Sequence, residues 1–400
     1  MPLIARTFIA ALLLATSTLA IAEQDWVERS NANAEPLLQV MAKYAPETAA
    51  ALGVEGFDAE VFDLKPQNDL RFEADAARVA SDLESRLAAE PDARVRQDMQ
   101  ILIDTARDQK ATSELNRRLM LPYFDLTQAL FQGFNALLDP RVSKDRHPAA
   151  LVRLRKYTGR EPGYEPITKL AQARTAERFE TAGLTGPWTV EVEQALQNQP
   201  RFVAGIRDLF KKSGLTGWEK DLKVLESQLD AHAKWLRTEL LPRARTTNRL
   251  PPEIYADNLK NFGVKADPRA LIDQATLSFV QTREEMQTLA NLVAKERGFP
   301  SSDYRDVLAA LRKEVIAEDA LLPTYKARLA SLEEIVRRED IVSLPERPAV
   351  IRLGTPAESA AQPAPHLRPP RLIGNAGESA EFVLPLENPN APPGTKMDDF

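Results

Sequence analysis

The sequence contains no cysteine and only three histidines, and both shortages restrict the chemistry it can perform. Without cysteine the chain forms no disulfide, so its stability must come from the packing of its core. His147, His232 and His366 are far apart, and no two of them have the spacing of an H-E-x-x-H zinc motif. A zinc ion needs three or four ligands that converge within bonding distance. We therefore expect no metal and no other cofactor in this chain.

Other motifs and charge patterns are also missing. The sequence has no G-x-S-x-G nucleophile elbow, no G-x-x-x-x-G-K-[ST] phosphate loop and no G-x-G-x-x-G turn. We therefore assign no catalytic residue. The net charge of −6 provides no basic stripe for nucleic acid and no polybasic patch for a membrane surface. We expect no nucleic-acid partner.

The N-terminus has the three parts of a secretory signal peptide. Arg6 is the only charge before Glu23, residues 7–14 are almost wholly apolar, and the segment ends in Ala20-Ile21-Ala22. The apolar run is too short to span a bilayer, which takes about 20 residues. We predict cleavage between Ala22 and Glu23, an exported protein that is periplasmic or secreted, and no membrane anchor after cleavage. The alternative is a buried N-terminal helix.

After this segment, apolar residues recur at intervals of three and four, which indicates amphipathic helices that pack together. The clearest stripes lie within residues 95–106, 126–137, 218–240 and 322–336. Asp267 before Pro268 is typical of a helix start, and Gly298 of a helix end. We predict a helical domain over residues 23–340, after a signal peptide over residues 1–22.

The composition changes near residue 341, and eleven of the 29 prolines lie between Pro345 and Pro393. Two short runs, Ala349–Leu353 and Glu381–Leu384, are rich in branched and aromatic residues and predict strands. The fold class is therefore mainly α, a multi-helix array with a small β element near the C-terminus. The alternative for residues 341–400 is an extended proline-rich tail. Residues 388–400 have no closing helix, which is typical of a truncated piece.

The histidines and aromatic residues are more typical of structure than of a site. His232 lies on an apolar helical stripe, which predicts a buried histidine with a neighbouring hydrogen-bond partner. His147 precedes Pro148, which favours a surface or capping role, and His366 lies among prolines in a predicted loop. The aromatic cluster that includes Tyr123 and Phe124 favours a core position over a ligand box.

Several segments, taken in order, resemble the domain-of-unknown-function 885 family. They are Pro46–Val54 with Gly56 and Asp58, Leu250–Tyr255, Asp267-Pro268, Leu321–Tyr325, Ile341–Pro345 and Ala364–Pro370. The resemblance runs from about Trp26 to Phe400. It implies an exported or lipid-anchored, largely helical protein that is similar to zinc metallopeptidases. A lipid anchor through cysteine is excluded here, because no cysteine follows the apolar segment.

The family's decisive motif resembles H-E-x-x-x-G-H, in which two histidines bind zinc and the glutamate is the general base. It lies after the stretch matched here. The resemblance therefore implies the N-terminal part of a peptidase-like protein, inactive as given, with zinc and a peptide substrate expected only for the full-length protein.

The resemblance also implies that a peptide adds to the edge of a small sheet. Glu381, Phe382, Val383 and Leu384 form our candidate edge strand and substrate-binding segment, and an interior strand is the alternative. A second interpretation of the whole chain is a non-enzymatic helical binding or scaffold protein of the periplasm.

Overall fold

The computed structural model describes residues 25–314, 316–344, 349–375 and 377–386. It confirms a mainly α fold with a small sheet near the C-terminus. The predicted signal peptide, its cleavage site between Ala22 and Glu23, and the segment 388–400 lie outside the described residues. The chain divides into two compact units, one formed by residues up to 199 with 206–255, the other by 200–205 with the residues from 256 onward.

The first unit is helical and begins with a helix over residues 25–44. Its further elements are α2 (Pro46–Leu52), α3 (Asn68–Leu87), α4 (Ala93–Leu119), α5 (Leu126–Leu138), η1 (Lys144–Arg146), α6 (Ala149–Thr158), α7 (Ile167–Ala176), α9 (Glu219–Trp235), η2 (Leu236–Leu240) and η3 (Leu241–Arg243). Two helices, α8 (Thr189–Ser213) and α10 (Pro252–Asn261), contribute residues to both units. Each predicted apolar stripe of this unit lies on a helix.

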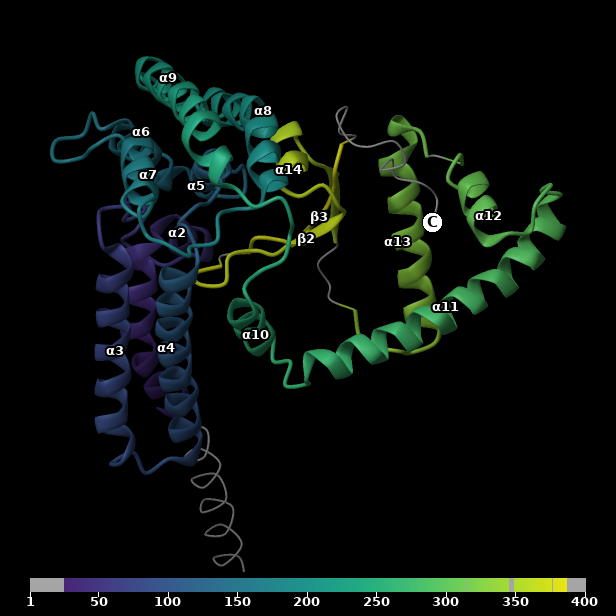
Figure 1. Ribbon diagram of the computed structural model, residues 1–400, viewed down its shortest axis with the longest axis horizontal. Coiled ribbons are helices and arrows are strands. Elements are labelled where there is room, and N and C mark those ends of the chain that lie inside the picture. The colour runs from purple at the N-terminus through teal and green to yellow at the C-terminus, as the bar shows by residue number, and fades with distance from the viewer. Residues whose placement is uncertain (1–24, 315, 345–348, 376, 387–400) are drawn as a thin grey trace, which may run out of the picture. The chain divides into compact units, whose positions relative to one another are not determined.

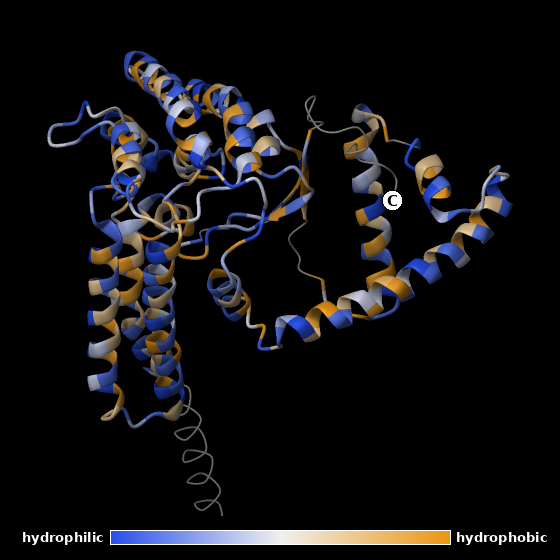
Figure 2. Ribbon diagram, viewed as in Figure 1, coloured by the Kyte–Doolittle hydropathy of each residue, from blue (hydrophilic) through white to orange (hydrophobic). Residues whose placement is uncertain are grey.

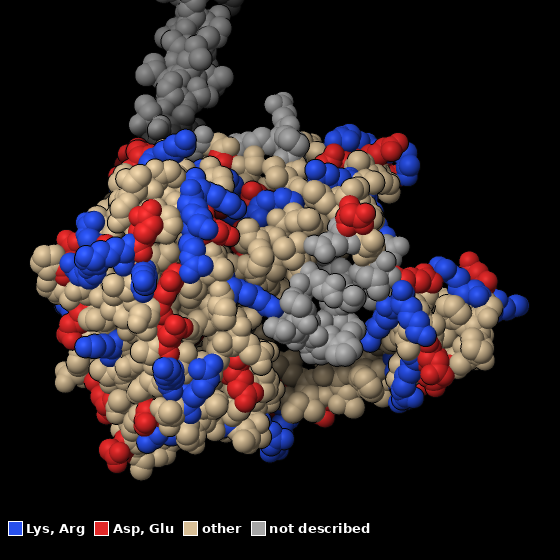
Figure 3. All heavy atoms as spheres, turned by 90° about the horizontal axis from the view of Figure 1, so that it is seen from above, with Lys and Arg blue, Asp and Glu red and all other residues tan. Residues whose placement is uncertain are grey.

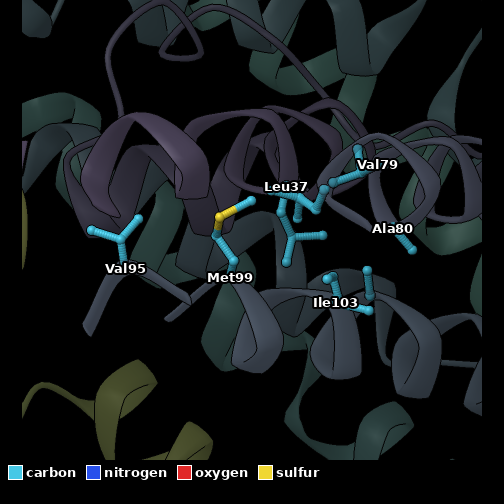
Figure 4. Close-up of a cluster of buried hydrophobic side chains, with 8 residues drawn as sticks. Leu37, Val79, Ala80, Val95, Met99 and Ile103 are labelled. Carbon is cyan, nitrogen blue, oxygen red and sulfur yellow. The ribbon is translucent and has the colours of Figure 1, made fainter. Parts of the chain in front are cut away.

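The helices α3 and α4 lie side by side as a long hairpin against the first helix (Figure 1). Val95, Met99 and Ile103 recur every four residues along α4 and are almost completely buried. They pack against Leu37 of the first helix and Val79 of α3 (Figure 4). The spacing that predicted this helix is therefore the spacing of its buried face.

A buried polar network connects α2, α5 and α6. Arg153 is fully buried and donates hydrogen bonds to three backbone carbonyls, those of Phe57, Glu60 and Gly133. The Tyr157 hydroxyl donates to Glu47 Oε1 at 2.6 Å, also in the interior. Because these bonds reach the loop after α2, they fix irregular backbone that has no helix of its own.

The second unit contains α11 (Pro268–Arg297), α12 (Tyr304–Leu311), α13 (Glu318–Arg338), β1 (Val350–Leu353), α14 (Pro356–Ala361), β2 (His366–Arg368) and β3 (Glu381–Leu384). The predicted start and end of α11 are confirmed. The Asp267 carboxylate accepts a hydrogen bond from the Arg269 backbone N–H, and Gly298 adopts a left-handed φ of 67°. Both features satisfy backbone groups that a helix leaves open at its ends.

The three strands form one sheet in the order β1-β3-β2, with β3 parallel to β1 and antiparallel to β2. The extended-tail alternative for residues 341–400 is therefore wrong for its described part. The predicted edge position of Glu381–Leu384 is also wrong, because β3 is the central strand. Both runs predicted as strands are confirmed, whereas β2 and the short helix α14 were not predicted. Leu321 of α13 packs on Ile351 and Leu384, which buries one face of the sheet.

No helix among the described residues is both long enough and apolar enough to cross a bilayer. On the face that Figure 3 shows, basic and acidic side chains are interspersed, with no large area of one sign. The predicted boundary at residue 340 stays a prediction.

Candidate functional site

The three histidines lie on separate elements. His232 is buried on α9, as predicted, and His147 at the end of η1 is buried too, so its predicted surface position is wrong. His366 lies in β2 rather than in a loop, since its backbone pairs with Val383. Among the described residues, no three His, Asp or Glu side chains gather closely enough to hold a metal ion.

The predicted substrate-binding segment Glu381–Leu384 is mostly enclosed. Val383 and Leu384 are 1% and 0% exposed, and β1 and β2 occupy both sides of the strand. The Glu381 carboxylate contacts Arg352 at 3.0 Å and Arg368 at 3.5 Å. These contacts stabilise the sheet, and the substrate-binding role of the four residues stays a prediction.

A pocket of about 360 Å³ lies within the first unit, where segments from α3, α4, α7, α8 and α9 meet. Its size falls in the range of small-molecule sites. Charged residues in its lining are Asp69, Arg117, Arg174, Glu191 and Arg245. Aromatic residues in its lining are Tyr123, Phe124, His232 and Trp235.

Two of the arginines at the pocket are neutralised by carboxylates of α3. Arg117 Nε and Nη2 each lie 3.0 Å from an oxygen of Glu73, a bidentate pair in which Glu73 is 5% exposed. Arg174 Nη2 donates to Asp69 Oδ1 at 2.6 Å. These pairs tie α4 and α7 to α3 and so hold one wall of the pocket in place.

The other two charges at the pocket have no ionic partner. Neither the Glu191 carboxylate nor the Arg245 guanidinium forms an ion pair with any residue that the structure describes. Arg245 donates from Nη1 to the Gly186 carbonyl, and its Nε is buried without a partner. Both residues are nevertheless close in the fold, because the Thr189 backbone N–H donates to the Arg245 carbonyl at 2.9 Å. That bond joins Arg245 to the first turn of α8, which carries Glu191.

Stacked rings form the aromatic side of the pocket. His232 and Trp235 stack with ring centroids 5.9 Å apart, and Trp235 stacks on Phe179 at 6.1 Å. Burial lowers the pKa of His232 to about 4, so the imidazole is neutral at neutral pH. Gln172 Nε2 lies 3.3 Å from His232 Nδ1 and donates to it. His232 therefore contributes an uncharged ring rather than a cation.

Tyr123 and Phe124 line the same pocket, so their predicted core position is wrong in part. Burial raises the pKa of the Tyr123 hydroxyl, and the negative charges of Asp125 and Glu191 raise it further. The hydroxyl is closed to solvent and has no hydrogen-bond partner in the part of the chain that the structure describes. The pocket thus has two buried hydrogen-bonding groups without a partner among the described residues, the Tyr123 hydroxyl and the Arg245 Nε, beside the exposed carboxylate of Glu191.

Sequence reasoning did not identify Glu191 or Arg245. Each is an ordinary charged residue beside a helix start or in a connecting segment, and its lack of a partner is visible only in three dimensions. The one available signal was the run of glycine and proline at Gly183, Gly186 and Pro187, which marks the backbone that brings Arg245 to α8.

Residues 46–398 match a family described as "Bacterial protein of unknown function (DUF885)". No curated protein matches the chain. Among solved structures, it is similar to a protein from Shewanella oneidensis described as a candidate lipoprotein of unknown function, with a TM-score of 0.58 and 16% identity. The match covers 92% of this chain and 66% of that protein, so the chain spans slightly under two thirds of that protein's length. At this identity the likeness concerns the fold alone.

Proposed function

The chain belongs to the DUF885 family, and on that premise we propose that it is the helical N-terminal part of an exported, zinc-dependent peptidase-like protein. The length of the Shewanella protein, of which the chain spans 66%, supports the existence of a further part. The description of that protein as a candidate lipoprotein supports export.

The observation that carries the proposal is the first half of α11. Ile272, Leu277 and Phe279 are 59–63% exposed. Ile272 and Phe279 are seven residues apart and share one face of α11, whereas Leu277 lies on another face. Hydrophobic and hydrophilic residues alternate along this helix (Figure 2). A helix with apolar residues on several sides is stable when other protein surfaces cover it. We infer that a part of the full-length protein packs around this segment.

Zinc does not fit the described residues. His147 follows η1, His232 lies on α9 and His366 in β2, and Nδ1 of His232 already accepts a hydrogen bond from Gln172. The zinc expected for the full-length protein therefore has to be held by residues outside the described ones. If a peptide adds to the sheet, the strands open to it are the two outer ones, β1 and β2, because β3 is enclosed.

The test uses the complete gene product. We expect purified full-length protein to contain bound zinc and to cleave peptides, and a chelator to remove both properties together. N-terminal sequencing of protein from cells should give a mature chain that begins at Glu23. A full-length product without zinc and without peptide cleavage would contradict the proposal, and a retained N-terminus would contradict export by a cleaved signal.

A second candidate function is ligand binding without catalysis, and the pocket of the first unit favours it. The pocket has the size and mixed polarity of a small-molecule site, and all of its lining belongs to one unit. Under this alternative the full-length protein binds a ligand but contains no zinc. The two candidates therefore separate in a metal analysis before any substrate is known.

A further inference from the structure

We propose that the pocket of the first unit binds a free α-amino acid, with Glu191 receiving its ammonium group and Arg245 its carboxylate. This inference deepens the ligand-binding role of the pocket and does not depend on the proposed peptidase activity. It begins from the contrast between the paired and the unpaired charges of the lining.

The paired charges leave little for a ligand to neutralise. Glu73 occupies both Nε and Nη2 of Arg117, and Asp69 contacts Arg174. By contrast, Glu191 and Arg245 line the same pocket, carry opposite charges and form no ion pair with each other. Arg245 is half-buried and Glu191 is exposed, so both can be reached by a ligand in the pocket. A ligand with one positive and one negative group would satisfy both at once, whereas a simple anion or cation would satisfy only one.

The apolar residues of the lining indicate which kind of amino acid the pocket binds. Its apolar part includes Leu121, Trp235, Leu236 and Leu250, and neutral His232 adds a ring without charge. Such a wall favours an apolar or aromatic side chain on the ligand. An amino acid such as phenylalanine has the three required groups, the ammonium, the carboxylate and an aromatic ring.

The experiment measures binding to the full chain by calorimetry with three probes: L-phenylalanine, N-acetyl-L-phenylalanine, which has no ammonium, and L-phenylalaninamide, which has no carboxylate. We expect phenylalanine to bind about tenfold more tightly than either blocked form, the ratio that one charge-assisted contact provides. Equal binding of all three probes, or no binding of phenylalanine, would overturn the proposal.

Variants assign each contact to its residue. Glu191→Gln should weaken phenylalanine about tenfold and leave N-acetylphenylalanine unchanged, because that probe has already lost the ammonium. Arg245→Gln should weaken phenylalanine and leave phenylalaninamide unchanged. Arg245→Lys keeps the positive charge and should retain most of the affinity. If either Gln variant weakens all three probes equally, the specific pairing is wrong.

Matched controls come from the same segments. Glu193→Gln changes an exposed carboxylate on α8 that does not line the pocket, and Arg249→Gln does the same for an exposed arginine near Leu250. Both should bind phenylalanine as the unmodified chain does. A loss in these controls equal to that of the pocket variants would show a general charge effect and would also refute the assignment.

Discussion

Replacing Tyr157 by Phe tests the buried network that fixes the loop after α2. The change removes one hydroxyl that donates to Glu47 Oε1 at 2.6 Å, while the ring keeps its edge-to-face contact with Phe134. Glu47 Oε1 then keeps only the bond from the Phe62 backbone N–H, and Oε2 already lacks a partner. Hydrogen bonds to charged buried groups contribute about 1.5–3 kcal/mol, so we expect the free energy of unfolding to fall by about 2 kcal/mol.

Urea denaturation followed by tryptophan fluorescence measures this loss. All four tryptophans, at positions 26, 188, 218 and 235, belong to the first unit, so the signal reports the unit that contains Tyr157. Tyr164→Phe is the matched control, because the Tyr164 hydroxyl lies 3.5 Å from Glu60 and the ring retains its contact with Lys156. A distance this long contributes little, so the control should lose no more than about 0.5 kcal/mol.

The loss should also depend on pH. Burial raises the pKa of Glu47 above its ordinary value of 4.5, although Arg153 and Tyr157 oppose this. A raised pKa in the folded state contributes stability below pH 4.5 that disappears as the pH rises through the folded value. The hydrogen bond from the Tyr157 hydroxyl stabilises the ionised form of Glu47, so it reduces the stability that is lost as the pH rises. Tyr157→Phe should therefore cost more at neutral pH than at pH 4.5, and an equal cost at both would refute this account.

Three further outcomes follow from other contacts. Gly186→Ala would place its Cβ 2.1 Å from the Arg243 carbonyl oxygen, and we expect a loss of about 1–3 kcal/mol in the same fluorescence assay; an unchanged midpoint would contradict the close approach. Burial raises the pKa of Glu358, but the hydrogen bonds from Arg352 and the Thr355 N–H outweigh burial and lower the pKa to about 2. The stability from these contacts is therefore present above pH 4.5 and is lost as the pH falls through about 2. Glu358→Gln should reduce this acid dependence in tyrosine near-ultraviolet dichroism, and an unaltered acid transition would refute it. The chain as given, mixed with zinc and peptides, should cleave nothing. Measured turnover would contradict the proposal that zinc is held outside the described residues.

The sequence predicted the helices well because their signals are local. Val95, Met99 and the residues around them reveal the buried face of α4 without knowledge of its partner, and Asp267 and Gly298 mark the ends of α11 through groups at most a few residues away. The predicted β3 has the same bounds in the structure for a similar reason, since a run of branched and aromatic residues favours a strand wherever it pairs.

The order of the sheet could not be read in the same way. The antiparallel partner of β3, which includes His366, is three residues long and lies among prolines, and no local pattern distinguishes it from a loop. The predicted edge position of Glu381–Leu384 follows from the family resemblance, and nothing in the run itself indicates a strand on its second side. Pairing between distant segments decides which strand is central, and the composition of a single strand does not indicate its partners.

The pocket shows why its residues were missed. Arg117 and Arg245 are the same residue type, and in the sequence each is one basic residue among many. In the structure, Arg117 pairs with Glu73 and completes a contact between two helices, whereas Arg245 lines the pocket without an ion pair to any described residue. An ion pair that joins helices is explained by the fold, whereas the Arg245 Nε is buried and has no partner among the described residues, so its lost hydration is not replaced. The buried Nε of Arg245, which lacks a partner among the described residues, together with the nearby exposed carboxylate of Glu191 is therefore the feature that points to a ligand, and only the three-dimensional arrangement provides it.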